Sequence, residues 1–150
     1  MIKIICIGKI KENYLKEALL EYQKRITKYS KIEIIELPDY DFEIKKTLEK
    51  ERDHILKAIK SGDYNILLDL NGKSLTSLEF ANHFDKIRQI NSNINFIIGG
   101  SFGVHADIKE ICQEKISFSK LTFPHQLFRV ILLEQIYRSF KILNHEEYHK

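Results

Sequence analysis

The sequence has few of the residues that mark linkers and low-complexity segments. Its 150 residues include no tryptophan, two prolines and six glycines, too few for the Gly/Ser-rich or Pro-rich linkers that separate domains. We therefore expect one continuous domain over residues 1–150, since single hydrophobic cores are commonest at about 100 to 150 residues. The apolar share of 43% and the charged share of 30% are ordinary for a globular protein and argue against a disordered chain.

Cysteine and long apolar runs are also scarce. Cys6 and Cys112 are far apart and neither belongs to a Cys-x-x-Cys pair, so neither a zinc site nor a redox motif is indicated. The first apolar run, Met1 to Ile7, is too short for a secretory signal, and no run approaches the roughly 18 residues needed to cross a bilayer. We expect a protein of a reducing compartment, the cytoplasm, without a membrane partner.

A large charge of one sign is missing too. The 24 Lys and Arg residues against 21 Asp and Glu residues leave a net charge of +3. This is too little to coat nucleic acid non-specifically, so any polyanion must be bound by a local patch.

Short β-branched runs alternate with segments of helical spacing. Five runs are short enough for strands: 3–7, 32–37, 65–70, 95–98 and 116–118. Five segments have the apolar spacing of helices: 14–26, 44–59, 78–87, 106–114 and 125–141. Thr76 followed by Glu79 fits a capping box at the start of the third helix. The alternation predicts an α/β fold, with a mostly parallel sheet of five to six strands and helices on both faces.

The last helical segment, 125–141, is apolar around most of its girth. Its polar stripe is thin and contains Glu134, Arg138 and Lys141, and one sheet cannot bury the remaining surface. Such a helix is either central or lies between its own sheet and a second molecule. Because few helices are central in a chain of this length, we expect a homodimer that pairs through this segment.

Two glycine-containing segments follow predicted strands. Gly72-Lys73-Ser74 resembles the end of a P-loop, but the required first glycine is replaced by Leu67, so a turn with positive φ at Asn71-Gly72 is the better interpretation. Gly99 to Gly103 lies between a strand and a helix, where open α/β sheets bind ligands. The pattern is not GxGxxG, which disfavours a conventional NAD site. Either a ligand approaches these glycines closely or they form only a tight turn.

The segment from Ser117 to Gln126 runs from a strand end into a helix start. Pro124 falls near the first helical turn, where its missing N–H costs nothing. Leu121 and Phe123 supply apolar walls of the kind found in cofactor pockets; the alternative is a simple helix-capping loop. His125 has no Ser or Cys nucleophile and orienting acid identifiable beside it, so a capping or core role is the more frequent one.

The C-terminal tail ends in polar aromatic residues. His145 and His149 lack a third and fourth ligand at a recognisable spacing, so we expect no metal. Tyr148 can stack on a nucleobase, and His149 or Lys150 can meet a phosphate group. The alternative is a frayed terminus without a function.

Three segments together match the pattern of one family. They are Ile97-Ile98-Gly99-Gly100-Ser101-Phe102-Gly103, then Ser117-Phe118-Ser119-Lys120-Leu121-Thr122-Phe123-Pro124-His125-Gln126, then Leu133-Glu134-Gln135-Ile136-Tyr137-Arg138-Ser139-Phe140-Lys141 with the terminal Tyr148-His149-Lys150. With the opening Ile7-Gly8-Lys9 and the middle Leu68-Asp69-Leu70-Asn71-Gly72-Lys73, they closely resemble the RlmH family. This family comprises SPOUT-class methyltransferases that modify N3 of a pseudouridine in large-subunit (23S) ribosomal RNA. The likeness covers nearly the whole chain, and the order and spacing of the motifs make it specific.

The resemblance implies several further features. It implies a C-terminal trefoil knot, an exception to the rule that chains do not thread loops, and a homodimer in which the tail of one subunit reaches the cofactor site of the other. It implies S-adenosylmethionine as the cofactor. The positions that match the family's cofactor loops are Leu68, Gly100, Ser119, Lys120, Leu121, Thr122, Phe123 and Pro124. The tail lacks the proline often found just before the Tyr-His pair.

The implied reaction depends mainly on positioning. A sulfonium methyl group is already activated, so no metal is needed, and the protein has to align N3 with the methyl group and assist proton loss. We predict that Arg138 stabilises negative charge on the flanking carbonyl oxygens and that Tyr148 and His149 grip or deprotonate the base. The alternative for Arg138 is a surface pair with Glu134 one helical turn away.

Two other functions stay open at this point. One is a SPOUT methyltransferase that acts on another RNA position, and the other is a non-catalytic dimeric module that binds the ribosome. The small net charge does not favour tight non-specific binding to naked RNA. We therefore expect 23S ribosomal RNA within the assembled ribosome to be the substrate.

Overall fold

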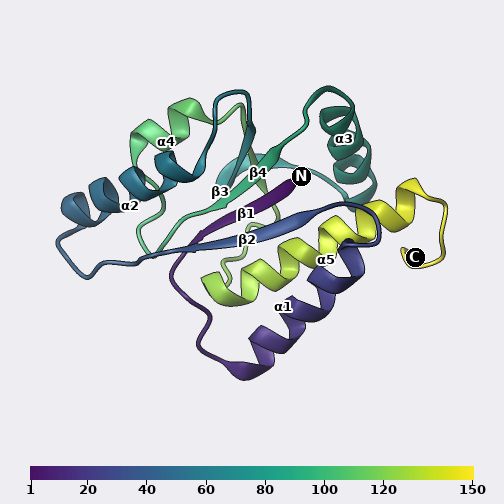
Figure 1. Cartoon of the computed structure of the whole chain (residues 1–150), viewed down its shortest axis with the longest axis horizontal. Helices are drawn as coiled ribbons and strands as arrows, with labels where there is room; N and C mark the ends of the chain where they lie inside the picture. Colours follow the sequence, from purple (N-terminus) through teal and green to yellow (C-terminus); the bar gives the residue numbers. More distant parts are fainter.

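Five parallel strands form one sheet with helices on both faces. The computed structural model describes residues 1–150 (Figure 1). The elements in chain order are β1 (Ile2–Ile7), α1 (Asn13–Ile26), β2 (Ile32–Leu37), α2 (Ile44–Ala58), β3 (Tyr64–Ser74), α3 (Ser77–Ile90), β4 (Ile94–Ile98), α4 (Ala106–Ile111), β5 (Glu114–Ser117) and α5 (His125–Leu143). The strand order is β2-β1-β4-β3-β5, and every neighbouring pair is parallel. The predicted α/β class with five strands and alternating helices is confirmed.

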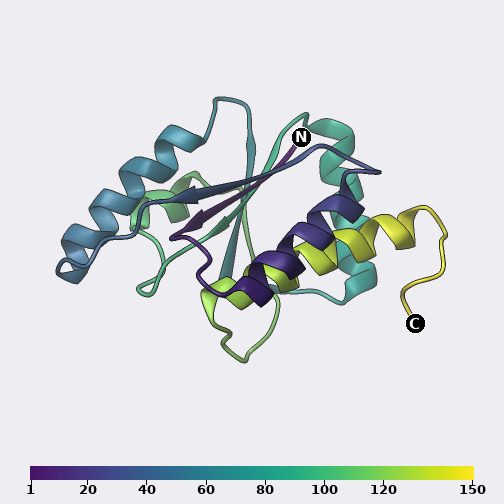
Figure 2. The ribbon, with the colours of Figure 1, turned by 60° about the horizontal axis from the view of Figure 1, so that its bottom comes forward.

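The inner strands β1 and β4 are buried along their whole length because helices cover both faces of the sheet. On one face, Ile4 and Cys6 of β1 belong to a core shared with α1, α3 and α5. On the other face, Ile5 of β1 packs in a smaller core with Ile55 of α2 and Ile108 of α4. Figure 2 shows α1 and α5 side by side on one side of the sheet, with α2 and α4 on the other. This arrangement explains why no strand alternates between apolar and polar residues.

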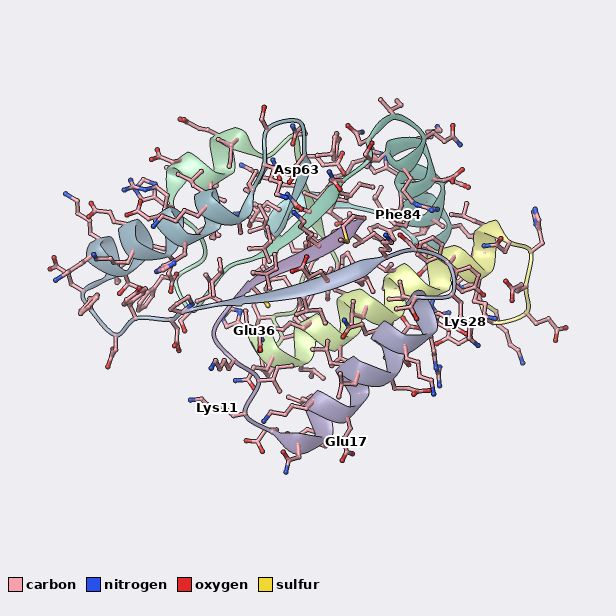
Figure 3. All side chains as sticks on the ribbon, in the orientation of Figure 1. Lys11, Glu17, Lys28, Glu36, Asp63 and Phe84 are labelled. Atoms are coloured by element: carbon pink, nitrogen blue, oxygen red, sulfur yellow. The ribbon has the colours of Figure 1, made fainter.

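The apolar girth of α5 is covered largely by the chain itself. The helix packs against both α1 and α3. The ring of Phe140 stacks on Tyr29, next to α1, at 5.2 Å and meets Phe84 of α3 edge-on at 5.6 Å; Phe84 is labelled in Figure 3. A second molecule is therefore not needed to bury the middle of this helix. The expectation of a homodimer has to be supported by other observations.

The segment after β3 departs from the predicted turn. Leu68 and Lys73 both align with Ile116 of β5, so residues 69–72 form a bulge within one long strand. The residues with positive φ are Gly8, Gly62, Gly103 and His145, so the prediction of positive φ at Gly72 is wrong. A Cβ atom on Gly72 would lie 2.6 Å from the backbone of Lys115 and Ile116. Glycine is required there because β5 approaches closely.

Helix boundaries show one further difference and one confirmation. α4 ends at Ile111 rather than at residue 114, because β5 already begins at Glu114. The capping box of α3 is confirmed: the Glu79 N–H donates to Thr76 Oγ1 at 3.1 Å, and the Thr76 N–H donates to Glu79 Oε1 at 2.9 Å. None of the helices has the length and hydropathy that crossing a membrane requires.

Candidate functional site

Three chain segments line a cavity toward the carboxyl ends of the neighbouring strands β4, β3 and β5. Its volume is about 470 Å³, within the range of about 300 to 1,000 Å³ that is typical of small-molecule sites. The walls come from residues 67–71 within β3, from residues 98–101 and 103–104 at and after the end of β4, and from residues 116–119 and 121–123 at and after the end of β5. His125 and Phe128 of α5 and Lys109 of α4 complete the lining. This is the edge at which parallel sheets bind ligands.

Most of the predicted cofactor residues lie together at this cavity. The six that line it are Leu68, Gly100, Ser119, Leu121, Thr122 and Phe123. The other two, Lys120 and Pro124, are exposed and do not line it. Pro124 is instead the N-cap residue of α5, and its carbonyl oxygen accepts the N–H of Phe128 at 2.9 Å. The structure thus brings together segments that are far apart in the sequence, while their role in cofactor binding stays a prediction.

The loops around the cavity are shaped by short local contacts. Gly99 faces the backbone of Gly103 so closely that a Cβ atom would lie 2.6 Å from the Gly103 oxygen, and Gly103 has a φ of +77°. The Ser119 hydroxyl accepts the N–H of Leu121 at 2.9 Å, and the Ser117 hydroxyl donates to the Ser119 carbonyl at 3.1 Å. The glycine segment is therefore a tight turn that also lines the cavity, while the approach of a ligand to it stays a prediction.

The three predicted catalytic residues form a second cluster at the far end of α5. Arg138 Nη1 lies 3.0 Å from His149 Nδ1, and the Arg138 guanidinium lies 4.9 Å from the centre of the Tyr148 ring. Glu134 pairs with Arg138, as the alternative interpretation required, and also accepts the Tyr148 hydroxyl at 3.1 Å. Burial is the main cause that raises the pKa of Tyr148 above its ordinary value. The tail is therefore packed on the helix rather than frayed.

Within one chain the two clusters are separate. At a rise of about 1.5 Å per residue, α5 holds His125, in the cavity, about 20 Å from Arg138. The C-terminus lies beyond the far end of α5 in Figure 1, away from the start of this helix. The predicted cofactor-binding and catalytic residues therefore lie at two separate places in one chain.

Comparison with known proteins decides which family this geometry belongs to. The family model described as "Predicted SPOUT methyltransferase" matches residues 1–149. The chain belongs to the SPOUT methyltransferase family. Its sequence is 49% identical over 154 residues to a Caldicellulosiruptor saccharolyticus protein, covering 100% of both chains, and 50% identical over 153 residues to a Fusobacterium nucleatum protein, covering 99% of both. Both relatives are named ribosomal RNA large subunit methyltransferase H.

A solved structure agrees with the fold of this SPOUT methyltransferase. A protein from Haemophilus influenzae Rd KW20, described as a probable methylase family protein, superposes with a TM-score of 0.60. The similar region covers 99% of this chain and 70% of the other, at 13% sequence identity. At this identity the likeness concerns the fold alone.

Sequence reasoning missed three ionisable groups that line the cavity of this family member. Asp69 lies in the bulge and its carboxylate accepts the N–H of Asn71 at 3.0 Å; Lys109 projects from α4. His125 was expected to be a cap or core residue, yet it lines the cavity. Partial burial of the ring and, second, the positive charge of Arg129 lower the pKa of His125, which favours the neutral imidazole. Asp69 belongs to the motif Leu68-Asp69-Leu70-Asn71-Gly72-Lys73, which could have pointed to it as a site residue. Nothing in the sequence around Lys109 indicates that its side chain lines a cavity.

The lining fits the methyl donor that the resemblance implies. Leu68, Val104 and Phe123 offer apolar surface for a purine ring, and the glycine backbone of residues 99–103 allows a planar group to approach closely. The Asp69 carboxylate offers a partner for a positively charged group such as a sulfonium or an ammonium. No three or more His, Cys, Asp or Glu side chains in the chain are grouped so that they could hold a metal ion.

Proposed function

We propose that the protein transfers a methyl group from S-adenosylmethionine to N3 of a pseudouridine in 23S ribosomal RNA, on the assembled ribosome in the cytoplasm. The observation that carries this proposal is the cavity, because its walls include six of the residues to which the family resemblance assigns the methyl donor. The names of relatives that are about half identical over the full chain support the same reaction class.

The residues of the chain divide the work between holding the donor and handling the base. Bound S-adenosylmethionine supplies a methyl group that its sulfonium has already activated. Leu68 and Phe123 would hold the apolar part of the donor and Asp69 would pair with its positive part, so that these side chains would orient the donor toward the base. The methyl group of the donor needs little further activation. The rate of methyl transfer therefore depends mainly on how accurately the donor is positioned.

The cluster at the end of α5 acts on the base. Glu134 fixes the Arg138 guanidinium through two hydrogen bonds, so Arg138 is oriented in advance to stabilise the negative charge that develops on the carbonyl oxygens beside N3. The raised pKa of Tyr148 keeps its hydroxyl protonated, so it donates a hydrogen bond rather than accepting a proton. His149 is left as the group that takes the proton from N3. Because a guanidinium only donates, the Arg138 contact occupies the free lone pair of His149 Nδ1, so His149 accepts the proton once Arg138 has turned from it to the carbonyl oxygens of the base.

The active site is completed by a homodimer, in which the tail of one subunit reaches the cavity of the other. Two observations support this assembly. The catalytic cluster lies about 20 Å along α5 from the cavity of its own chain. Apolar side chains are exposed around the cavity mouth, including Leu121, 71% exposed, Leu70 and Phe102; exposed apolar groups of this kind mark association surfaces.

The C-terminal part forms the trefoil knot of the SPOUT class. β5 lies at the sheet edge beside β3, whereas Arg129 of α5 contacts the end of β1. Because β3 and β4 lie between β5 and β1 in the sheet, the segment between β5 and α5 has to pass these two strands, and it lines the same cavity as residues 69–71. Stretching single molecules by both termini tests the knot. A knotted chain stops short of the full extension of about 3.3 to 3.6 Å per residue, and a chain that reaches it has no knot.

Labelled S-adenosylmethionine, incubated with the protein and with ribosomes that lack the modification, tests the reaction. We expect label on N3 of one pseudouridine in 23S ribosomal RNA, and none when naked RNA replaces the ribosome. Label on a different nucleotide would indicate a SPOUT methyltransferase with another target. Calorimetry without a binding signal for S-adenosylmethionine would indicate the non-catalytic module.

Mixed dimers test the division of the site between two chains. Arg138→Ala removes the catalytic guanidinium, and Thr122→Trp places a large ring at an exposed position of the cavity wall. Each variant alone should be inactive, with donor binding lost only in Thr122→Trp. Random mixing should restore about a quarter of the wild-type activity, since half of the dimers are mixed and each has one intact site. No recovery in confirmed mixed dimers would contradict the shared site.

A further inference from the structure

Arg129 is a buried cation that the proposed reaction does not use. It lies in the second turn of α5 and is 1% exposed. Its Nη1 donates to Glu36 Oε2 at 3.0 Å, and its Nη2 donates to the carbonyl oxygens of Ile7 at 2.7 Å and Gly8 at 2.9 Å. The Nε of Arg129 is also buried and has no partner.

These contacts join three elements that are far apart in the sequence. Arg129 belongs to α5, Ile7 and Gly8 end β1, and Glu36 is near the end of β2. The same Glu36 oxygen also accepts the N–H of Ile10 at 2.9 Å, so it fixes the loop that follows β1. Glu36 is labelled in Figure 3, beside the start of α5. The guanidinium is therefore the centre of a connection between the start of α5 and the carboxyl edge of the sheet.

Both sides of this connection reach the cavity. On α5, the cavity-lining His125 and Phe128 lie four residues and one residue before Arg129. On the sheet, Ile7 lies against Gly100, since a Cβ atom on Gly100 would be 3.4 Å from Ile7 Cγ2. Arg129 itself does not line the cavity. Arg129 therefore connects the cavity wall on α5 to the cavity wall on the sheet, although its own side chain does not line the cavity.

Stability alone does not explain an arginine at this position. Burying a guanidinium costs several kcal/mol, and an apolar side chain of similar volume is often at least as stabilising. Here the charge has a single carboxylate partner and one N–H without any acceptor. What an apolar side chain cannot provide is a rigid fork that binds two carbonyl oxygens and a carboxylate at fixed directions.

We propose that Arg129 is a positioning residue for the methyl donor. By holding the first turns of α5 against the ends of β1 and β2, it fixes the segment 119–128 relative to Gly100 and so keeps the cavity at the width that the donor requires. This inference rests on the proposed function, because it takes S-adenosylmethionine as the ligand. It adds a residue outside the cavity to those that determine how tightly the donor is held.

Two substitutions at Arg129 separate positioning from catalysis. Arg129→Met removes the fork and the charge, and Arg129→Lys keeps the charge but not the fork. We expect Arg129→Met to raise the Kd for S-adenosylmethionine at least about tenfold, and Arg129→Lys to give a smaller rise, since small displacements of a site have large effects. KM for the donor should rise in parallel, while kcat at saturating donor stays within about threefold of wild type.

Controls keep the test independent of folding. Arg88→Met removes a different arginine, which is half-buried and whose guanidinium lies 4.7 Å from the Phe140 ring, away from the cavity; it should leave the Kd unchanged. Glu36→Gln keeps an acceptor for the Ile10 N–H and removes only the charge that orients Arg129. It should raise the Kd by several-fold, and it serves if Arg129→Met does not fold.

The possible outcomes separate the two proposals. A wild-type protein that does not bind S-adenosylmethionine in calorimetry would contradict the proposed function itself. If the wild type binds and the folded Arg129→Lys and Glu36→Gln variants bind equally well, the positioning role is wrong. A variant at Arg129 with a normal Kd and a lowered kcat would also overturn it, because the residue would then act on the reaction rather than on donor binding.

Discussion

Glu51 gives a stability prediction with a defined dependence on pH. Its side chain, on α2, is buried, with the residue 5% exposed, and both carboxylate oxygens lie 3.3 Å from where a Cβ atom of Gly100 would be. Burial and, second, the negative charge of Asp39 raise the pKa of Glu51 from 4.5 to about 6. Folding therefore disfavours the ionised carboxylate. The folded protein carries a cost of about 2 kcal/mol once the carboxylate is ionised in both the folded and the unfolded state.

The sign of the effect follows from the two pKa values. Below about pH 4.5 the group is protonated in both states and costs nothing, and the free energy of unfolding then falls as the pH rises through about 6. Glu51→Gln removes the ionisation. We expect it to raise the free energy of unfolding by about 2 kcal/mol more at about pH 8 than at about pH 4.5. The cost of burying the amide that Glu51→Gln introduces does not depend on pH. This cost therefore cancels when the effects of the substitution at the two pH values are subtracted.

Urea denaturation of the wild type and of Glu51→Gln at both pH values measures this difference. Glu49→Gln, on the same helix but only half-buried, is the matched control and should change the free energy of unfolding by less than about 0.5 kcal/mol at either pH. An equal effect of Glu51→Gln at the two pH values, or destabilisation only at the higher one, would refute the reasoning. Glu51 would then have a partner that favours its ionised form.

Two further substitutions test the backbone features described above. Gly72→Ala places a methyl group against the backbone of β5 and should lower the free energy of unfolding by at least about 2 kcal/mol; Gly62→Ala, which meets no atom but has a φ of +88°, should cost only about 1 kcal/mol in the same urea titration. Equal costs would mean that β5 moves aside. Thr76→Ala removes the side-chain half of the capping box on α3 and should cost about 1 kcal/mol, measured by thermal unfolding. A loss that Thr76→Ser does not largely restore would assign the effect to packing instead.

The elements of the fold were predictable because their signals are local. Buried β-branched runs indicate strands covered on both sides, and the capping box at Thr76 depends on residues three apart. The bulge at residues 69–72 was not predictable, because its cause is the approach of β5, which the strand's own sequence does not encode. The girth of α5 was interpreted as a dimer surface for a similar reason: its cover comes from α1 and α3.

The site was predictable in its loops but not in its connections. Two of the three cavity segments follow β4 and β5, and the third is the bulged part of β3 beside them; because these parallel strands are neighbours, their convergence is a consequence of topology. Arg129 carried no signal, because a single arginine in an apolar helix does not reveal that its acceptors are main-chain carbonyls 121 and 122 residues earlier. The position of Arg138 near the far end of α5 agrees with the predicted helix over residues 125–141, whereas the packing of Tyr148 and His149 back onto Arg138 had no signal in the sequence.

The position of α5 affects when the protein can finish folding. This helix is the last element of the chain, yet it fills the space between α1 and α3 and supplies Leu132, Leu133, Ile136 and Phe140 to the main core. A growing chain whose final residues are still inside the translating ribosome lacks these four of the 20 buried residues of that core, and α1 and α3 have nothing between them. The protein therefore completes its fold only after release from the ribosome. A protein proposed to act on ribosomes thus reaches its folded structure after it has left the ribosome that synthesised it.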